Sequence, residues 1–224
     1  MNKLSMLFLS GSLAAIPTVL QATETTQTNE TTHKQVDISD PMAVYTGGAL
    51  TGGNDGLGGA FQFGLHKGDW GILGKVEAKK NLDAYRARLF TPNSKTGTGI
   101  FIDAGTDSSR EGITSNYATV GVLQVIPLAK HLKLYAGLTY GKSWEAHELF
   151  SETKIVIAQS YFKYDINDKF YMMLNPQYTY GFDGEKTRKF MMEFNFGYHI
   201  DATKLVYLET STEEVVILNF KFKI

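Results

Sequence analysis

The sequence has no cysteine, only 5 prolines and almost no net charge, because 22 Lys and Arg stand against 23 Asp and Glu in 224 residues. Without cysteine the chain has no disulfide framework, no thiolate metal site and no thiol nucleophile. A formal net charge of -1 provides no basic field for nucleic acid, so no nucleic-acid partner is expected. Glycine (22), tyrosine (12) and phenylalanine (14) are abundant, and this composition favours strands.

The N-terminal residues 1–22 have the features of a secretory signal peptide. Lys3 supplies a short positive region, residues 4–20 are apolar but interrupted by glycine and proline, and Ala22 is a small residue for cleavage. An N-terminal membrane anchor is the alternative, although the apolar run is short and broken for a membrane span. Residues 23–41 are Thr-rich and polar, which predicts a flexible segment, with a plug inside a pore as the alternative.

From residue 42 to the end, apolar and polar residues alternate with the period of two that is typical of β-strands. Residues 189–200 show it most clearly, with one apolar face and one polar face: Phe190, Met192, Phe194, Phe196, Tyr198 and Ile200 against Lys189, Glu193, Asn195 and His199. One apolar face would also suit a soluble sheet. Runs of ten or more residues, with aromatics near the ends of the apolar face, favour lipid contact instead. We therefore predict an all-β fold, a transmembrane antiparallel up-and-down β-barrel formed by residues 42–224.

The alternating runs number twelve, at residues 42–50, 57–66, 69–78, 82–91, 98–105, 116–127, 130–142, 153–164, 168–181, 187–200, 203–210 and 215–224. Tight connections follow several even-numbered runs, and longer polar ones follow the fifth, seventh, ninth and eleventh. In bacterial barrels short turns face the periplasm, so this alternation predicts an even strand number with both termini periplasmic. Ten strands is the alternative, because residues 47–59 are rich in glycine and form strands poorly.

Motifs for chemistry are weak in this sequence. Residues 136–143 match a relaxed phosphate-binding loop, but they complete an amphipathic strand where that motif needs a following helix. An outer-membrane lipid hydrolase would need a Ser–His pair, and only His147, with Ser151 or Glu148, falls in a predicted outer loop. A solvated loop cluster is the preferred interpretation. We predict no catalytic or metal-binding residues, no cofactor and no enzymatic activity.

Three stretches near the C terminus carry a family resemblance: D-I-N-D-K-F-Y at 165–171, H-I-D-A-T-K-L-V-Y at 199–207 and F-K-F-K-I at 220–224. They resemble small bacterial outer-membrane barrels and, more narrowly, the twelve-stranded monomeric porins of the oligogalacturonate-specific and sialic-acid family. The resemblance implies passage of acidic oligosaccharides through a narrow lumen lined by two basic tracks.

Inward-facing charges suggest the function of the barrel. A hairpin about Lys80 and Asn81 would bring Lys75 close to Arg86, and the strand parities give eight inward cations against three inward anions. This excess predicts a monomeric, porin-like channel of the bacterial outer membrane, in contact with lipid and passing small, anionic solutes. The predicted pore-lining residues are Lys75, Arg86, Arg88, Asp103, Lys133, Tyr171, Lys189, Glu193 and Lys221. The alternative is a closed barrel with Asp103 paired to Arg86, serving as a structural, adhesion or assembly-partner protein.

Overall fold

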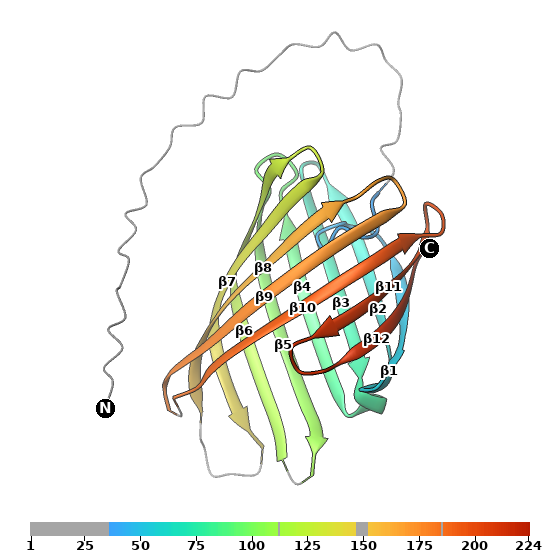
Figure 1. The fold of residues 1–224 in the computed structure, drawn as a ribbon. Helices are drawn as coiled ribbons and strands as arrows, with labels where there is room; N and C mark the ends of the chain where they lie inside the picture. Colours follow the sequence, from blue (N-terminus) through green and yellow to red (C-terminus); the bar gives the residue numbers. More distant parts are fainter. Residues whose placement is uncertain (1–35, 112, 147–151, 185) are drawn as a thin grey trace, which may run out of the picture. The chain divides into compact units, whose positions relative to one another are not determined.

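A computed structural model describes residues 36–111, 113–146, 152–184 and 186–224. Over these residues the chain forms a closed barrel of twelve antiparallel strands, each paired with its neighbour in sequence and β1 paired with β12 (Figure 1). The strands are β1 (Gly47–Gly53), β2 (Gly56–Lys67), β3 (Trp70–Lys79), β4 (Ala84–Pro92), β5 (Thr98–Arg110), β6 (Ile113–Ala129), β7 (Leu132–Glu145), β8 (Thr153–Asp165), β9 (Phe170–Asp183), β10 (Arg188–His199), β11 (Lys204–Ser211) and β12 (Val216–Lys223). The predicted twelve-stranded up-and-down barrel is confirmed, and the ten-strand alternative is wrong.

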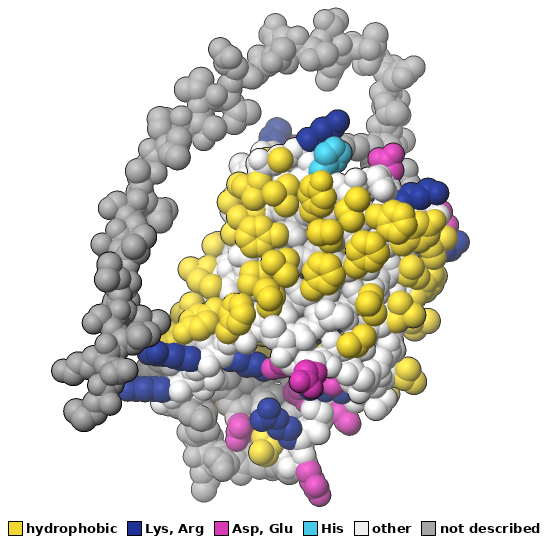
Figure 2. Space-filling view, viewed as in Figure 1, with side chains coloured by type: hydrophobic (Ala, Val, Ile, Leu, Met, Phe, Trp, Pro, Cys, Tyr) yellow, Lys and Arg dark blue, Asp and Glu magenta, His cyan; other side chains and the backbone are white. Residues whose placement is uncertain are grey.

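Alternate side chains of each strand separate into an apolar outside and a mostly polar inside. In β12, Leu218 is 61% exposed whereas the neighbouring Asn219 is 3% exposed. Figure 2 shows the outward apolar side chains gathered in a belt, with charged side chains towards the two ends of the barrel. Such an apolar band is the surface that a transmembrane barrel presents to lipid. Among the described residues, no helix has the length and apolarity needed to cross a membrane.

The barrel has two ends, which we name by the chain segments found there. The termini end holds the start of β1, the end of β12 and the turn between β8 and β9, and the loop end holds the end of β7 and the start of β8 (Figure 1). The longer polar connection predicted after the fifth run is wrong, because β5 and β6 continue as a hairpin to Arg110 and Ile113 with a register shift after Asp107. Backbone pairing of Thr106 with Asn116 and of Asp107 with Ser115 continues the ladder here, although these side chains are polar.

The wall is much lower on one side of the barrel than on the other. β6 has 17 residues and β7 has 14, whereas β1 has 7 and β11 and β12 have 8 each. The seam at which the barrel closes, between β1 and β12, is therefore its shortest side.

The first strand lies later in the chain than predicted, at Gly47–Gly53 and not at residues 42–50. A Cβ atom at Gly53 would lie 2.0 Å from the carbonyl oxygen of Val216, and one at Gly47 would lie 2.1 Å from that of Phe222. Glycine is needed where the backbones of β1 and β12 approach so closely. The glycine content that argued against a strand thus serves barrel closure.

Candidate functional site

The middle of the lumen contains a layer of paired charges from β3, β4 and β5. Lys75 Nζ lies 2.7 Å from a carboxylate oxygen of Glu77, and Arg88 pairs with the other oxygen of that carboxylate. Arg86 donates from Nε to Asp103 over 2.9 Å, and its Nη2 contacts the second oxygen. Each of these three cations therefore has a carboxylate partner inside the barrel.

The predicted contact between Lys75 and Arg86 is wrong by two residues of register. Lys75 is opposite Arg88, and Glu77 is opposite Arg86. The cause is the turn between β3 and β4, where a short 3-10 segment, Lys80–Leu82, has three successive residues with positive φ, at 53°, 56° and 77°. This turn places the carboxylate of Glu77, and not the ammonium of Lys75, opposite Arg86, so the cations are interleaved with anions.

The wall opposite the arginines is acidic and rich in amides. β4 and β10 are six strands apart in both directions around the twelve-stranded ring, and Glu193 of β10 accepts a hydrogen bond of 2.7 Å from Asn175. Arg86, Arg88, Glu193 and Glu209 line one cavity of about 120 Å³. The arginines and the glutamates therefore face each other across the narrow middle of the lumen.

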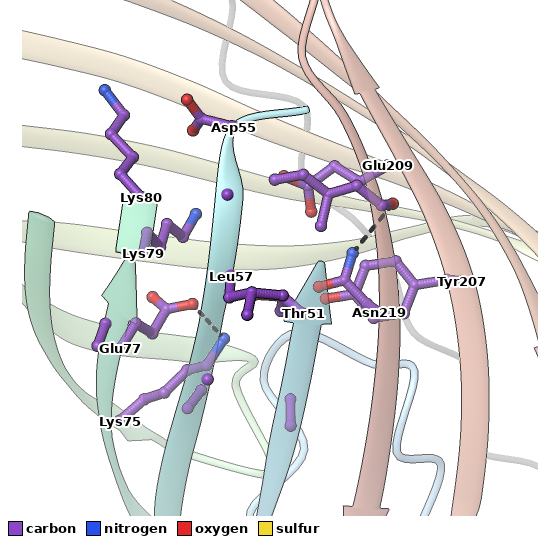
Figure 3. A pocket seen from close by; sticks show the side chains of 16 residues that line it. Thr51, Asp55, Leu57, Lys75, Glu77, Lys79, Lys80, Tyr207, Glu209 and Asn219 are labelled. Atoms are coloured by element: carbon purple, nitrogen blue, oxygen red, sulfur yellow. Dashed lines mark hydrogen bonds and ion pairs between the residues drawn. The ribbon is translucent and has the colours of Figure 1, made fainter. Parts of the chain in front are cut away.

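A smaller cavity of about 30 Å³ adjoins this region along the inner surface of β1 to β3. Figure 3 shows Glu77 and Lys79 on one side of it and Tyr207 and Glu209 on the other. Glu209 was not among the predicted pore-lining residues, although it shares a face of β11 with Tyr207 and could have been found by extending the parity argument to that strand.

Residues 36–46 lie inside the barrel at its termini end and form no strand of the wall. Lys163 Nζ lies 2.8 Å from Asp37, Lys133 Nζ lies 3.2 Å from Asp40, and Lys221 donates to the Ile38 carbonyl oxygen over 2.7 Å. Residues 36–41, the described end of the segment predicted to be flexible at 23–41, therefore contact the inner wall of the barrel. Residues 1–35, including the predicted signal peptide, lie outside the described residues.

Apolar contacts explain why this segment enters the lumen. Ile38 is 1% exposed and packs with Tyr45, Tyr171 and Leu205, while a second cluster joins Met42 and other residues of the segment to inward side chains of β3 to β8. Burial of such side chains stabilises the docked segment by roughly 1.5–3 kcal/mol each. The segment contributes apolar surface as well as charge, and it closes the core at this end.

The electrostatics of Asp37 follow from its position at the termini end. Burial by itself would raise the pKa of this carboxyl, but the Lys163 ammonium and hydrogen bonds from Ser39 lower the pKa to about 2. His199 also faces Asp37, at 3.7 Å from Nε2 to the carboxylate oxygen. Asp37 is therefore ionised throughout the physiological pH range.

The nine predicted pore-lining residues fall into three groups along the lumen. Five lie in or border the middle layer, namely Lys75, Arg86, Arg88, Asp103 and Glu193. Three contact the segment at the termini end, namely Lys133, Tyr171 and Lys221. Lys189 lies in a cavity of about 410 Å³ at the loop end and pairs with Glu213 at 2.6 Å. Lys163, which is completely buried, was missed. It could have been found by parity, because it lies on the same inner face of β8 as Tyr161 and Asp165.

Among the described residues, no group of three or more His, Asp or Glu is placed to hold a metal ion. Residues 136–143 lie within β7, which continues as a strand to Glu145. His147 and Ser151 lie outside the described residues, so the absence of hydrolase activity stays a prediction.

The fold and the interior define a class, the twelve-stranded transmembrane β-barrel with a polar lumen. Among solved structures, the chain is similar to the NanC porin, with a TM-score of 0.53 and 14% identity over 81% of this chain and 100% of that one. A KdgM porin in complex with disordered oligogalacturonate matches with a TM-score of 0.49 and 10% identity, over 81% and 99% of the two chains. The predicted resemblance to the twelve-stranded porins is thus confirmed for the fold. No family model matches the sequence, and neither does any curated protein.

Proposed function

We propose that the protein is a channel of the bacterial outer membrane that passes small polar solutes by diffusion, with a weak preference for anions. The observation that carries this proposal is that Arg86 lines both the cavity in the middle of the lumen and the larger cavity at the loop end. The two cavities therefore share the Arg86 side chain, which is paired with Asp103 and is 25% exposed. The apolar belt and the fold shared with a porin support the membrane location.

The preference for anions is expected to be weak because the lumen is nearly balanced in charge. Five Lys or Arg and four Asp or Glu line the middle cavity, a smaller excess than the eight to three expected from the sequence. Fixed charges in a narrow lumen act with little screening, so even a small excess of one sign enriches the opposite ion. We therefore propose small anionic solutes as the preferred cargo of a monomeric barrel.

Reversal potentials in planar bilayers test this proposal. A KCl gradient across the purified full chain should give open-state currents with a reversal potential that favours chloride. Arg86→Glu with Arg88→Glu should move it towards cation preference, by an amount that shrinks at high salt because screening grows. Lys95→Glu with Lys204→Glu makes the same change of charge on exposed side chains near the turns and should leave selectivity unchanged. A conducting channel indifferent to the arginine substitutions would refute the selectivity proposal.

A closed structural or adhesion barrel is the second candidate function. The observation that favours it is that each arginine of the middle layer is ion-paired and that residues 36–46 occupy the termini end. A sealed lumen should show no stable conductance in the same bilayers, with or without the arginine substitutions. The two functions therefore give opposite results in one experiment.

A further inference from the structure

Three lysines from three different strands converge on a short piece of the chain's own N-terminal segment. Lys133 of β7 reaches Asp40, Lys163 of β8 reaches Asp37, and Lys221 of β12 reaches the backbone carbonyl of Ile38. The side chain of Lys163 has no exposed surface, and that of Lys133 is 40% exposed. The site therefore has three ammonium groups. They bind two carboxylates and one carbonyl oxygen of residues 37–40.

The arrangement has the chemistry of a carboxylate-binding site. An ammonium group withdrawn from water needs an anionic or hydrogen-bonding partner. Lys163 is also paired with Asp165 of the wall, whereas Lys133 and Lys221 have their hydrogen-bond partners, among the described residues, in the segment. Removing the segment would leave the ammonium groups of Lys133 and Lys221 without these partners, which a solute with two or more carboxylates could replace.

The segment is attached in a way that permits it to leave. Residues 36–46 add no strand to the barrel, and their backbone hydrogen bonds include turns within the segment, from Asp40 to Asp37 and from Ala43 to Asp40. Its departure would thus break side-chain contacts and a few bonds to the wall, such as that from Gln62 to the Tyr45 carbonyl oxygen, and would leave the closed strand ladder intact.

We infer that residues 36–46 are a displaceable plug, and that Lys133, Lys163 and Lys221 form a binding site for polycarboxylate solutes that the plug occupies with Asp37 and Asp40. Solute and plug compete for the same ammonium groups. Binding of the solute therefore shifts the equilibrium towards the unplugged state, by an amount set by how much more tightly the solute binds that state than the plugged one. This inference deepens the proposed function, since the solute reaches the site through the lumen, but its first test requires no ion current.

A single engineered cysteine measures whether the plug is docked. Ser39 is 5% exposed, and the chain has no native cysteine, so Ser39→Cys provides the only thiol. Its reaction with a membrane-impermeant maleimide should be at least about tenfold slower than that of Ala202→Cys, which is exposed in a turn at the same end, because reaction requires local opening. Citrate should accelerate labelling at position 39, whereas sodium chloride at equal ionic strength should not.

Substitutions on both sides of the contact separate competition from general loosening. Lys163→Gln in the Ser39→Cys chain should raise the basal labelling rate and reduce the effect of citrate. Asp37→Asn with Asp40→Asn leaves the barrel wall unchanged and should also raise the basal rate, which keeps the test valid where the lysine variant does not fold. Equal labelling of positions 39 and 202 without citrate would overturn the docked plug, and a citrate-insensitive rate in every variant would overturn the carboxylate site.

A reversible lock connects the plug to conduction. A Cβ atom built on Gly71 lies 3.6 Å from the Cβ of Val44, within the range of about 3.5–4.5 Å that disulfides require. Val44→Cys with Gly71→Cys should therefore suppress citrate-induced opening when oxidised and restore it after reduction, and Val44→Cys alone should behave like wild type. Equal opening in both redox states would refute the plug as the gate. Absence of current in all variants, with citrate-sensitive labelling at position 39, would refute the channel and retain the carboxylate site.

Discussion

Replacing Asp103 with asparagine should destabilise the barrel, because it removes the counter-charge of Arg86. Asp103 is 3% exposed and accepts hydrogen bonds from Arg86 Nε at 2.9 Å and from the Tyr117 hydroxyl at 3.0 Å. Asparagine keeps the size of the side chain but leaves the guanidinium unneutralised. Breaking a fully buried ion pair costs about 3–5 kcal/mol. Since the Arg86 side chain retains 25% exposure, water screens part of this cost, and we expect a loss of about 2–3 kcal/mol.

The free energy of unfolding can be measured by urea titration of the barrel in lipid vesicles, with the folded fraction read from heat-dependent mobility in SDS gels. A double-mutant cycle with Arg86→Gln isolates the pair, because asparagine and glutamine together leave no isolated charge, and we expect a coupling free energy of about 2 kcal/mol. Glu213→Gln is the control. It breaks the pair with Lys189, whose side chain is 55% exposed, and should change stability by less than about 0.5 kcal/mol.

Two results would refute this reasoning. If Asp103→Asn costs no more than Glu213→Gln, the middle of the lumen is wet enough to solvate Arg86 without a partner. If the losses from Asp103→Asn and Arg86→Gln are additive, the two side chains do not interact in the membrane as they do in the structure.

Three further predictions concern topology, closure and pH. A tag inserted near Glu148 should be cleaved by protease on intact cells and one at Asn167 should not; the reverse pattern would place the termini outside. Gly53→Ala should prevent formation of the heat-modifiable folded band, whereas Gly52→Ala, whose added Cβ meets only the flexible end of a leucine side chain at 3.3 Å, should fold. Because the pKa of Asp37 is lowered to about 2 from 3.8, its contribution to docking is complete above about pH 4 and is lost as the pH falls towards 2. Labelling of the cysteine at position 39, corrected for the pH dependence of the exposed cysteine at position 202, should therefore rise only in that acidic range.

The period-two pattern was sufficient to predict the class of fold and the inward face of each predicted site residue. A period of two shows on which face of the sheet a side chain lies, but not how far along the barrel axis it lies. That position depends on the register of the hairpins. The register of β3 and β4 depends on the positive φ angles at Lys80 to Leu82, which no residue type there requires. Lys75 was therefore placed on the correct face but opposite the wrong arginine.

The first strand and the plug were hard to predict for a different reason. Gly47 and Gly53 read as turn residues in isolation, and only the approach of β12 shows why they are glycines. The segment has too few apolar residues, Val36, Ile38 and Met42 among them, for the sequence to indicate that it is buried. In the structure, inward side chains such as Tyr171 and Leu205 provide the apolar surface that buries it. Both features depend on partners more than 100 positions away in the chain, which local patterns do not encode.

The low wall at the seam has a consequence for the surrounding bilayer. At about 3.3 Å per residue and a tilt near 40°, the eight residues of β12 cover roughly 20 Å of membrane thickness, less than the band of about 25 Å typical of such barrels. Lipids beside the seam must shorten or tilt to match it, at a cost of a fraction of a kcal/mol per Å. The locally thinned bilayer moves with the protein. A peptide that inserts beside β1 and β12 therefore crosses a thinner hydrocarbon layer than it would anywhere else around the barrel.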